Sequence, residues 1–277
     1  MNNEKKHVEQ VVSHIPLPAC PEILIKIDEL IASTSFDFGE LSALIKKDVA
    51  LSAGLIKLSN SPLYCLQKNA SIPVALQMIG AQQVAYYARA FLLQSAVSQG
   101  ASITRFWDSS WRVAEMSANI ARLLYRQKAD EIFTFGLFRD VGIAVLMNHY
   151  SNYKEILGLA NNDPDNAFTE HENREYSVNH AQIGAFIAED WHLPDYFVAA
   201  IQCHHTPDDV TKLPLSIPDS DRARELIAVA QLAEHAVQLS TGLSQTHEWS
   251  KLKGFCMDSL QLSEQETTAL ISAGIAA

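Results

Sequence analysis

The sequence predicts an all-α protein, and three observations lead to that fold class. Apolar residues recur at spacings of three and four through most of the 277 residues, as they do on the buried face of a helix. No stretch alternates apolar and polar residues in the way that a half-buried strand requires, and there is no fixed-period repeat. Proline, glycine and capping residues separate the periodic stretches. We therefore expect a multi-helix bundle.

The first expected helix follows Pro21, a residue that suits the first position of a helix. Its apolar face consists of Ile23, Ile27, Leu30 and Ile31. The second expected helix begins after Asp37, whose side chain can cap it, and Glu40 follows three residues later. Two amphipathic helices are therefore expected near the start of the chain, the second with a side-chain cap.

Two further helices are expected before residue 81. The stretch DVALSAGLIKLSNSPLY aligns Leu51, Leu55 and Leu58 and then stops at Ser-Asn-Ser-Pro. The stretch PVALQMIG closes at Gly80, which we expect to be a left-handed residue at the helix end. These segments complete an N-terminal helical part.

The rest of the chain is also expected to form helices separated by loops. Ile103–Tyr125 is a long amphipathic segment, and Asn161–Ser177 is polar and acidic, which favours an exposed connection or a short helix. The three prolines of His205–Asp221 separate the central block from a C-terminal helical tail. Within that tail, Ser263–Glu266 reads SEQE, a capping-box pattern.

Composition limits the classes of function. The formal net charge is −11 and the pI is near 5.3, so nucleic acid and anionic lipid would be repelled unless a basic patch existed, and none is evident. No signal peptide or membrane span is recognisable. The cysteines lack CxxC spacing, which indicates free thiols in a reducing compartment. We expect a cytoplasmic protein without a cofactor.

Polar residues that could form a site stand at the ends of apolar helical stretches. The segments GLFRDVG, VNHAQIGAF and AIQCHHTP contribute Asp140, His180, His204 and His205. Imidazoles and carboxylates that converge on one point are the ligands of hydrolytic metal sites. Arg139 argues against such a site, because a guanidinium has no lone pair and keeps its proton. It either acts as the cation of the pocket, beside Asp140 or a bound anion, or projects into solvent.

Each histidine also has a purely structural interpretation. His180 begins an apolar helical run, where a capping or packed histidine is more common than a ligand. Consecutive helical residues point about 100° apart, so at most one of His204 and His205 is expected to face a given site. Cys203 is expected to be a buried free thiol.

Several enzyme classes lack their motifs. There is no GxGxxG, GxxxxGK[ST] or GxSxG, so dinucleotide, P-loop and nucleophile-elbow chemistry have no support. The pair Glu234-His235 has no second histidine four residues later and so fails the zincin spacing.

Several long segments, in order, resemble the HDOD family, the HD-related output domains of bacterial signalling proteins. The segments are IPLPACPEILIKIDELI, FGELSALIKKDVALSAGLIKLSNSPLY, SIPVALQMIGAQQV, FWDSSWRVAEMSANIA, IFTFGLFRDVGIAVLMNHY and VNHAQIGAFIAEDWHLPDYFVAAIQCHHTP. The resemblance implies an HD-like bundle with an N-terminal helical subdomain. The expected division is a lead at 1–14, an HDOD domain at 15–212 (with parts 15–100 and 101–212) and a tail at 213–277 that packs on the second part.

The resemblance also implies where the metal ligands of the wider HD superfamily would lie. The early histidine should fall near Ser109–Trp111, where there is none, and the histidine of the His-Asp pair is Arg139. The late aspartate matches Gln231 best. His180, His204 and His205 match the additional histidines of the HD-GYP branch, but the signature that should follow them is missing. An HD-like scaffold without a metal hydrolase is implied.

The leading hypothesis is a non-catalytic signalling domain that acts through protein contacts or senses a small ligand. It carries a vestigial, anion-binding pocket without metal, formed by Arg139, Asp140, His180, His204, His205 and Gln231. The partners would be signalling proteins, with a nucleotide or cyclic dinucleotide as a further ligand. The alternative is a divergent metal-dependent phosphohydrolase with Asp140, His180, His204 and His205 as ligands. A structural assembly protein that self-associates is a third interpretation.

Overall fold

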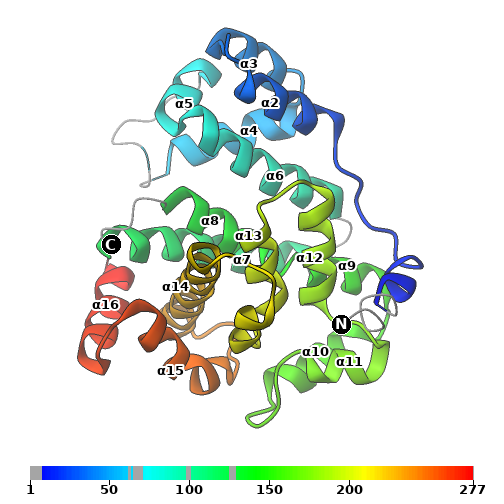
Figure 1. Ribbon diagram of the computed structural model, residues 1–277, viewed down its shortest axis with the longest axis vertical. Helices are drawn as coiled ribbons and strands as arrows, with labels where there is room; N and C mark the ends of the chain where they lie inside the picture. Colours follow the sequence, from blue (N-terminus) through cyan, green and yellow to red (C-terminus); the bar gives the residue numbers. More distant parts are fainter. Residues whose placement is uncertain (1–7, 62–63, 65–70, 98–100, 125–128, 277) are drawn as a thin grey trace. The chain divides into compact units, whose positions relative to one another are not determined.

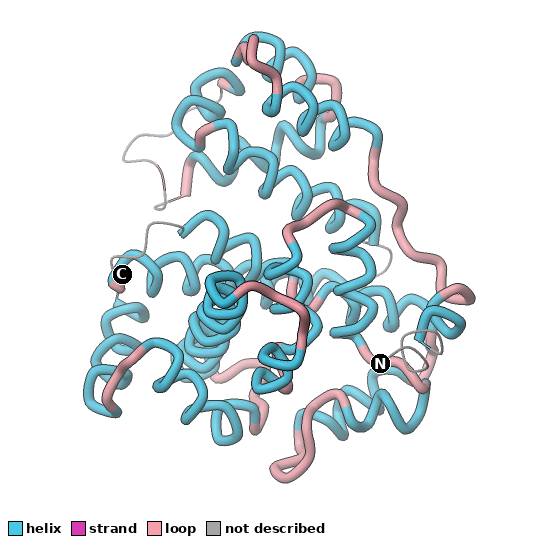
Figure 2. The backbone as a smooth tube through the Cα atoms, in the orientation of Figure 1, coloured by secondary structure: helices cyan, strands magenta, loops and turns pink. Residues whose placement is uncertain are grey.

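The computed structural model describes residues 8–61, 64, 71–97, 101–124 and 129–276. These residues form helices and connecting loops and contain no strand, which confirms the all-α prediction (Figures 1 and 2). The chain divides into two compact units, one formed by residues 18–98 and the other by residues 1–17 and 99–277. Each unit is described separately below.

The smaller unit contains five helices in its described residues: α2 (Glu22–Ala32), α3 (Phe38–Ile45), α4 (Val49–Ser59), α5 (Ile72–Ile79) and α6 (Ala81–Val97). The Asp37 side chain accepts a hydrogen bond from the Gly39 N–H at 2.7 Å and caps α3, as the sequence predicted. α4 packs on α5 and α6, and α2 packs on α3 and α6. The predicted apolar residues of α4 (Leu51, Leu55 and Leu58) are fully buried.

Two helix ends in this unit differ slightly from the prediction. Pro21 precedes α2 instead of occupying its first position. Gly80 has a positive φ of 92°, as expected of a helix-ending glycine, but its ψ of 147° is extended and not left-handed helical. The chain turns at Gly80 directly into α6, so an extended residue is what the connection requires.

The larger unit is built around α14 (Ile217–Thr241). Beyond residue 100 its other helices in the described residues are α7 (Ala101–Leu123), α8 (Ala129–Phe138), α9 (Val141–His149), α10 (Tyr153–Asn161), α11 (Glu170–Tyr176), α12 (His180–Asp190), α13 (Asp195–Cys203), the short 3₁₀ helix η1 (Pro207–Lys212), α15 (Glu248–Leu260) and α16 (Glu264–Ala276). α14 contacts α7, α8, α13, η1, α15 and α16, and the colours of Figure 1 show these partners around it. Helices from the centre and the C-terminal end of the chain therefore share one core.

The C-terminal segment follows its sequence pattern closely. The Ser263 hydroxyl accepts a hydrogen bond from the Glu266 N–H, and the Glu266 carboxylate accepts one from the Ser263 N–H at 2.8 Å, so the predicted capping box is confirmed. The polar stretch Asn161–Ser177 forms a loop and α11, but it is not exposed throughout. Glu172 is fully buried, and hydrogen bonds from the backbone and the side chain of a buried histidine compensate its carboxylate for the loss of water.

The cysteines and the long helices agree with the composition. Among the described cysteines, Cys20, Cys203 and Cys256 form no disulfide bond with one another, and Cys65 lies outside the described residues. Among the described helices, none combines the length and the apolar character that a membrane crossing demands.

Candidate functional site

The junction of α8 and α9 presents the first two polar residues of the site. α8 ends at Phe138, Arg139 and Asp140 form a turn, and α9 begins at Val141. The Asp140 side chain makes no capping bond to α9, so its carboxylate is free to point into the bundle. Gly142 explains the close approach to α12, because a Cβ there would lie 2.0 Å from the backbone oxygen of His180.

The substitution Gly142→Ala tests this close approach. A methyl group in contact with backbone at 2.0 Å must push α9 and α12 apart, which displaces His180 from Asp140. We expect a loss of unfolding free energy of about 1–3 kcal/mol, the usual cost of overpacking. Urea denaturation measures it, and Gly158→Ala is the control, since a Cβ at Gly158 meets nothing within 4 Å. Equal effects of the two substitutions would contradict the prediction.

His180 is held in place as the first residue of α12. Asn179 and Gln182 form a capping box that fixes where the helix begins. Glu172 of α11 accepts hydrogen bonds from both the backbone N–H of His180, at 3.0 Å, and its ring Nδ1, at 2.7 Å. The same carboxylate accepts the hydroxyl of the buried Tyr153. His180 therefore has no rotational freedom and directs its Nε2 away from Glu172.

His204 and His205 both reach the site, so the expectation that at most one of them faces it is wrong. α13 ends at Cys203, and the two histidines lie in the turn that follows. Because they are not part of a regular helix, the 100° angle between consecutive helical side chains does not apply to them. The His204 Nδ1 donates to the Ile201 carbonyl at 2.6 Å, and the His205 Nδ1 donates to Glu248 of α15 at 2.6 Å.

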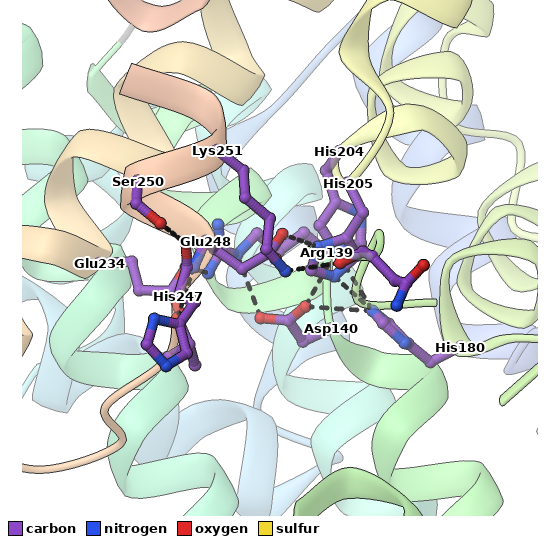
Figure 3. A network of polar contacts seen from close by, with 12 residues as sticks. Arg139, Asp140, His180, His204, His205, Glu234, His247, Glu248, Ser250 and Lys251 are labelled. Atoms are coloured by element: carbon purple, nitrogen blue, oxygen red, sulfur yellow. Dashed lines mark hydrogen bonds and ion pairs between the residues drawn. The ribbon is translucent and has the colours of Figure 1, made fainter. Parts of the chain in front are cut away.

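Four side chains converge from these elements (Figure 3). One ligand atom from each of Asp140, His180, His204 and His205 lies within 4.8 Å of the others. The Nε2 atom of His180 lies 3.3 Å from that of His204 and 3.1 Å from that of His205. The Asp140 Oδ1 lies 3.1 Å from the His204 Nε2. We name these four residues the convergent cluster.

The hydrogen bonds outside the convergent cluster decide the tautomers inside it. Carboxylates and carbonyls only accept, so the Nδ1 atoms of His180, His204 and His205 must carry the protons. Whenever one of these rings is neutral, its Nε2 carries a lone pair directed at the others and at Asp140. Lone pairs at about 3 Å repel one another unless a proton or a metal ion lies among them.

The donor set fits a metal ion. Metal-binding histidines almost always donate their second ring N–H to a carboxylate or carbonyl, and all three rings do so here. Ligands about 2.0–2.1 Å from a tetrahedral zinc ion lie about 3.3 Å from one another, which matches three of the separations in the convergent cluster. The His180 Nε2 lies 3.7 Å from the Asp140 Oδ1, and all four ligand atoms lie within 4.8 Å of one another.

Arg139 lies beside the convergent cluster and does not project into solvent, so that interpretation of the sequence is wrong. Its side chain is 4% exposed because two carboxylates neutralise it. Its Nε donates to the Asp140 Oδ2 at 3.1 Å and its Nη2 to the Glu234 Oε2 at 2.7 Å. Asp140 thus turns one oxygen to the histidines and the other to the guanidinium.

Charge and burial set the protonation of these groups. Burial opposes the ionisation of Asp140, but Arg139 and His204 outweigh it and hold its pKa well below the usual range. Burial and the neighbouring His204 lower the pKa of His205 to about 4. For His180, Glu172 outweighs burial and raises the pKa. At neutral pH the cluster therefore has an ionised carboxylate and a neutral His205, both in the state that a metal ligand needs. The raised pKa of His180 favours its protonated form, so a metal ion would have to displace the proton on its Nε2.

Comparison with known proteins matches the part of the chain that contains the convergent cluster. The HDOD domain family model matches residues 17–207, more than half of the sequence. The chain belongs to the HDOD family. An uncharacterised protein of Treponema pallidum is 27% identical to this HDOD protein over 198 residues, which are 68% of this chain and 37% of that relative. This chain therefore spans less than half of the relative's length.

Solved structures share the fold. An HDOD protein of unknown function from Geobacter sulfurreducens has a TM-score of 0.65 at 19% identity, over 98% of this chain and 93% of its own. A candidate metal-dependent phosphohydrolase from Shewanella amazonensis has a TM-score of 0.63 at 17% identity, over 99% and 100%. A candidate signal transduction protein from Marinobacter aquaeolei has a TM-score of 0.70 at 17% identity, over 99% and 63%.

Arg139 of this HDOD protein bonds to a residue of α14 that was not predicted as part of the site. Gln231, expected at the position of the late aspartate, is buried on α14, but the α14 side chain that bonds to Arg139 is Glu234. The spacing of three residues on one helix could have pointed to Glu234, because such residues share a face. Cys203 is buried, and burial with Asp209 nearby raises the pKa of its thiol to about 12. Its thiol is not among the ligand atoms that converge.

The residues that support the histidines gave no sequence signal. Glu172 lies in a polar stretch that looked exposed, and Glu248 lies in the tail beyond residue 207, where the family model ends. Glu248 is 2% exposed, and Lys251 donates to it at 2.9 Å, as Figure 3 shows. The site is therefore completed by the C-terminal segment.

Proposed function

We propose that this HDOD protein is a regulatory domain whose convergent cluster binds one divalent metal ion, zinc for preference, and does not hydrolyse phosphate esters. The observation that carries the proposal is the arrangement of three Nδ1-protonated histidines, whose Nε2 lone pairs meet one oxygen of Asp140. The leading hypothesis from the sequence was a regulatory domain with a metal-free pocket. We keep the regulatory role and propose a metal-binding site in place of the metal-free pocket.

The ligand number argues against hydrolysis. Structural zinc sites take four protein ligands, whereas catalytic ones take three and keep a position for water. Asp140, His180, His204 and His205 supply four. The second oxygen of Asp140 is occupied by Arg139, whose own second partner is Glu234, so no further cation fits beside that carboxylate. The bound ion would supply a rigid link between α9, α12 and the turn after α13.

The support for the ligands ties this link to more of the fold. Glu172 connects His180 to α11, and Glu248 connects His205 to α15. A protein partner that contacts the outer faces of these helices would therefore be sensitive to metal occupancy. This is the sense in which we propose a regulatory function, with signalling proteins as the partners.

A divergent metal-dependent phosphohydrolase is the second candidate function. The observation in its favour is that its four predicted ligands do come together and that the Asp140 side chain is 22% exposed. The Shewanella amazonensis protein that is named for this activity shares only the fold with this chain, at 17% identity.

The site does not favour a nucleotide or cyclic dinucleotide at Arg139. An anion would have to displace Asp140 or Glu234 from a side chain that is 4% exposed. That part of the sequence hypothesis stays a prediction.

A hydrolysis assay separates the two candidate functions. Protein loaded separately with zinc, manganese and iron is incubated with bis(p-nitrophenyl) phosphate, and release of nitrophenolate is followed. We expect the rate to equal that of the metal-free protein and of a loaded His180→Ala variant. Turnover that requires the metal and is lost in His180→Ala would establish the phosphohydrolase instead.

A further inference from the structure

A pocket of about 560 Å³ lies next to the convergent cluster, between η1, α14 and α15. It starts at His205 and extends along α15 past Lys251, Gly254 and Phe255, with Arg224 of α14 in its wall. Its volume lies within the range of about 300–1,000 Å³ that is typical of small-molecule sites. None of the functions considered above uses this pocket.

Arg224 is the residue that gives the pocket its chemistry. Its guanidinium lies over the Phe255 ring, 4.6 Å from the ring centroid, and its side chain is 24% exposed. Within the described part of the chain, its nearest carboxylate is that of Asp208, 3.9 Å away and 92% exposed, and the guanidinium donates no hydrogen bond. Five N–H donors on a stacked and partly buried cation are suited to an oxyanion such as phosphate.

The rest of the lining indicates a ligand with more than an anionic group. Lys251 adds a second positive charge, although Glu248 and the Asn166 carbonyl accept two of its hydrogen bonds. Three carboxylates line the same pocket: Asp208 and Asp258 are exposed, and Asp209 is half-buried and paired with Lys212. They would repel a bare anion and would accept hydrogen bonds from N–H groups on the ligand. The flat Arg224–Phe255 stack suits a planar ring.

We propose that this pocket binds a nucleoside monophosphate, with its phosphate at Arg224, its base against the Arg224–Phe255 stack and its base N–H groups toward the exposed carboxylates. The proposal goes beyond the metal site and does not require it, because Arg224 and Phe255 supply the contacts to the phosphate and the base and neither belongs to the convergent cluster. The ligand would lie beside His205 and Lys251, which Figure 3 shows with Glu248.

Isothermal titration calorimetry with AMP, GMP, CMP and UMP, each taken separately, tests the proposal on the full chain, both metal-free and zinc-loaded. Inorganic phosphate and the parent nucleosides are titrated for comparison. We expect at least one monophosphate to bind more tightly than phosphate alone in both forms of the protein. Arg224→Gln should weaken that binding about tenfold to a hundredfold, because a charged hydrogen-bond donor is lost.

A second pair of variants keeps the test independent of folding. Gly254 lines the pocket, and a Cβ there meets nothing within 4 Å, so Gly254→Trp fills the space while Gly254→Ala leaves it open. Binding should be lost in the first and retained in the second, and also retained in Arg174→Gln, which changes an arginine that is 59% exposed. No heat from any monophosphate at about 1 mM, or binding that survives Gly254→Trp, would overturn the proposal. Binding that occurs only with zinc present would do so too.

Discussion

Replacing Arg139 by Met lowers the free energy of unfolding by about 3–5 kcal/mol, the usual effect of removing one partner from a buried ion network. The guanidinium neutralises two carboxylates, and the side chains of Asp140 and Glu234 are only 22% and 18% exposed. Without Arg139 they face each other inside the bundle with no cation between them. Urea denaturation with a chelator present measures this effect separately from any loss of metal.

Two further variants identify the cause of that destabilisation. Arg139→Met combined with Glu234→Gln removes one of the stranded charges, so the double variant should be less destabilised than the sum of the two single variants. Arg174→Met, which breaks an exposed ion pair with Glu170, should change stability by less than about 1 kcal/mol. If Arg139→Met were as mild as Arg174→Met, the buried network would not have the role that we assign to it.

Replacing Glu172 by Gln weakens zinc binding about tenfold to a hundredfold, as is usual when the partner of a metal-binding histidine is changed. Glu172 accepts the Nδ1–H and backbone N–H of His180 and also the Tyr153 hydroxyl, all in a fully buried position. Glutamine offers one carbonyl oxygen and no charge, so His180 loses both orientation and basicity. Competition with a chelating dye measures the zinc affinity.

The control for this variant lies on the same helix. Glu170 pairs with the exposed Arg174, and Glu170→Gln should leave zinc affinity unchanged. Circular dichroism of both variants verifies that α11 and the bundle remain folded. An unchanged affinity in Glu172→Gln would mean that His180 does not bind the metal.

The helices could be predicted from local features of the sequence. The Asp37 cap, the buried leucines of α4 and the capping box at Ser263 all depend on residues within a few positions of one another. Such local signals are readable without tertiary information. The ψ angle of Gly80 could not be predicted from such local signals, because it depends on the direction in which α6 continues.

The site was predictable only in part. The sequence named Asp140, His180, His204 and His205 as the ligand set of the alternative hypothesis, and the structure brings these four side chains together. The supporting carboxylates come from positions 8, 43 and 95 residues away from their partners, as seen for Glu172, Glu248 and Glu234. Contacts at such separations leave no local pattern. For the same reason, the sequence suggested that the positive charge of Arg139 would repel a metal ion. In the structure that charge is neutralised by the Asp140 Oδ2 and by Glu234, on the side of Asp140 that faces away from the histidines.

The metal content of the untagged protein, purified without chelator, tests the central claim most directly. Plasma mass spectrometry on the native chain should find about one equivalent of a divalent transition metal, zinc for preference, and much less in Asp140→Ala and His180→Ala. One metal per chain that depends on both residues is the result that our account predicts. Native protein that contains no metal and takes up none from added zinc, manganese or iron would contradict it.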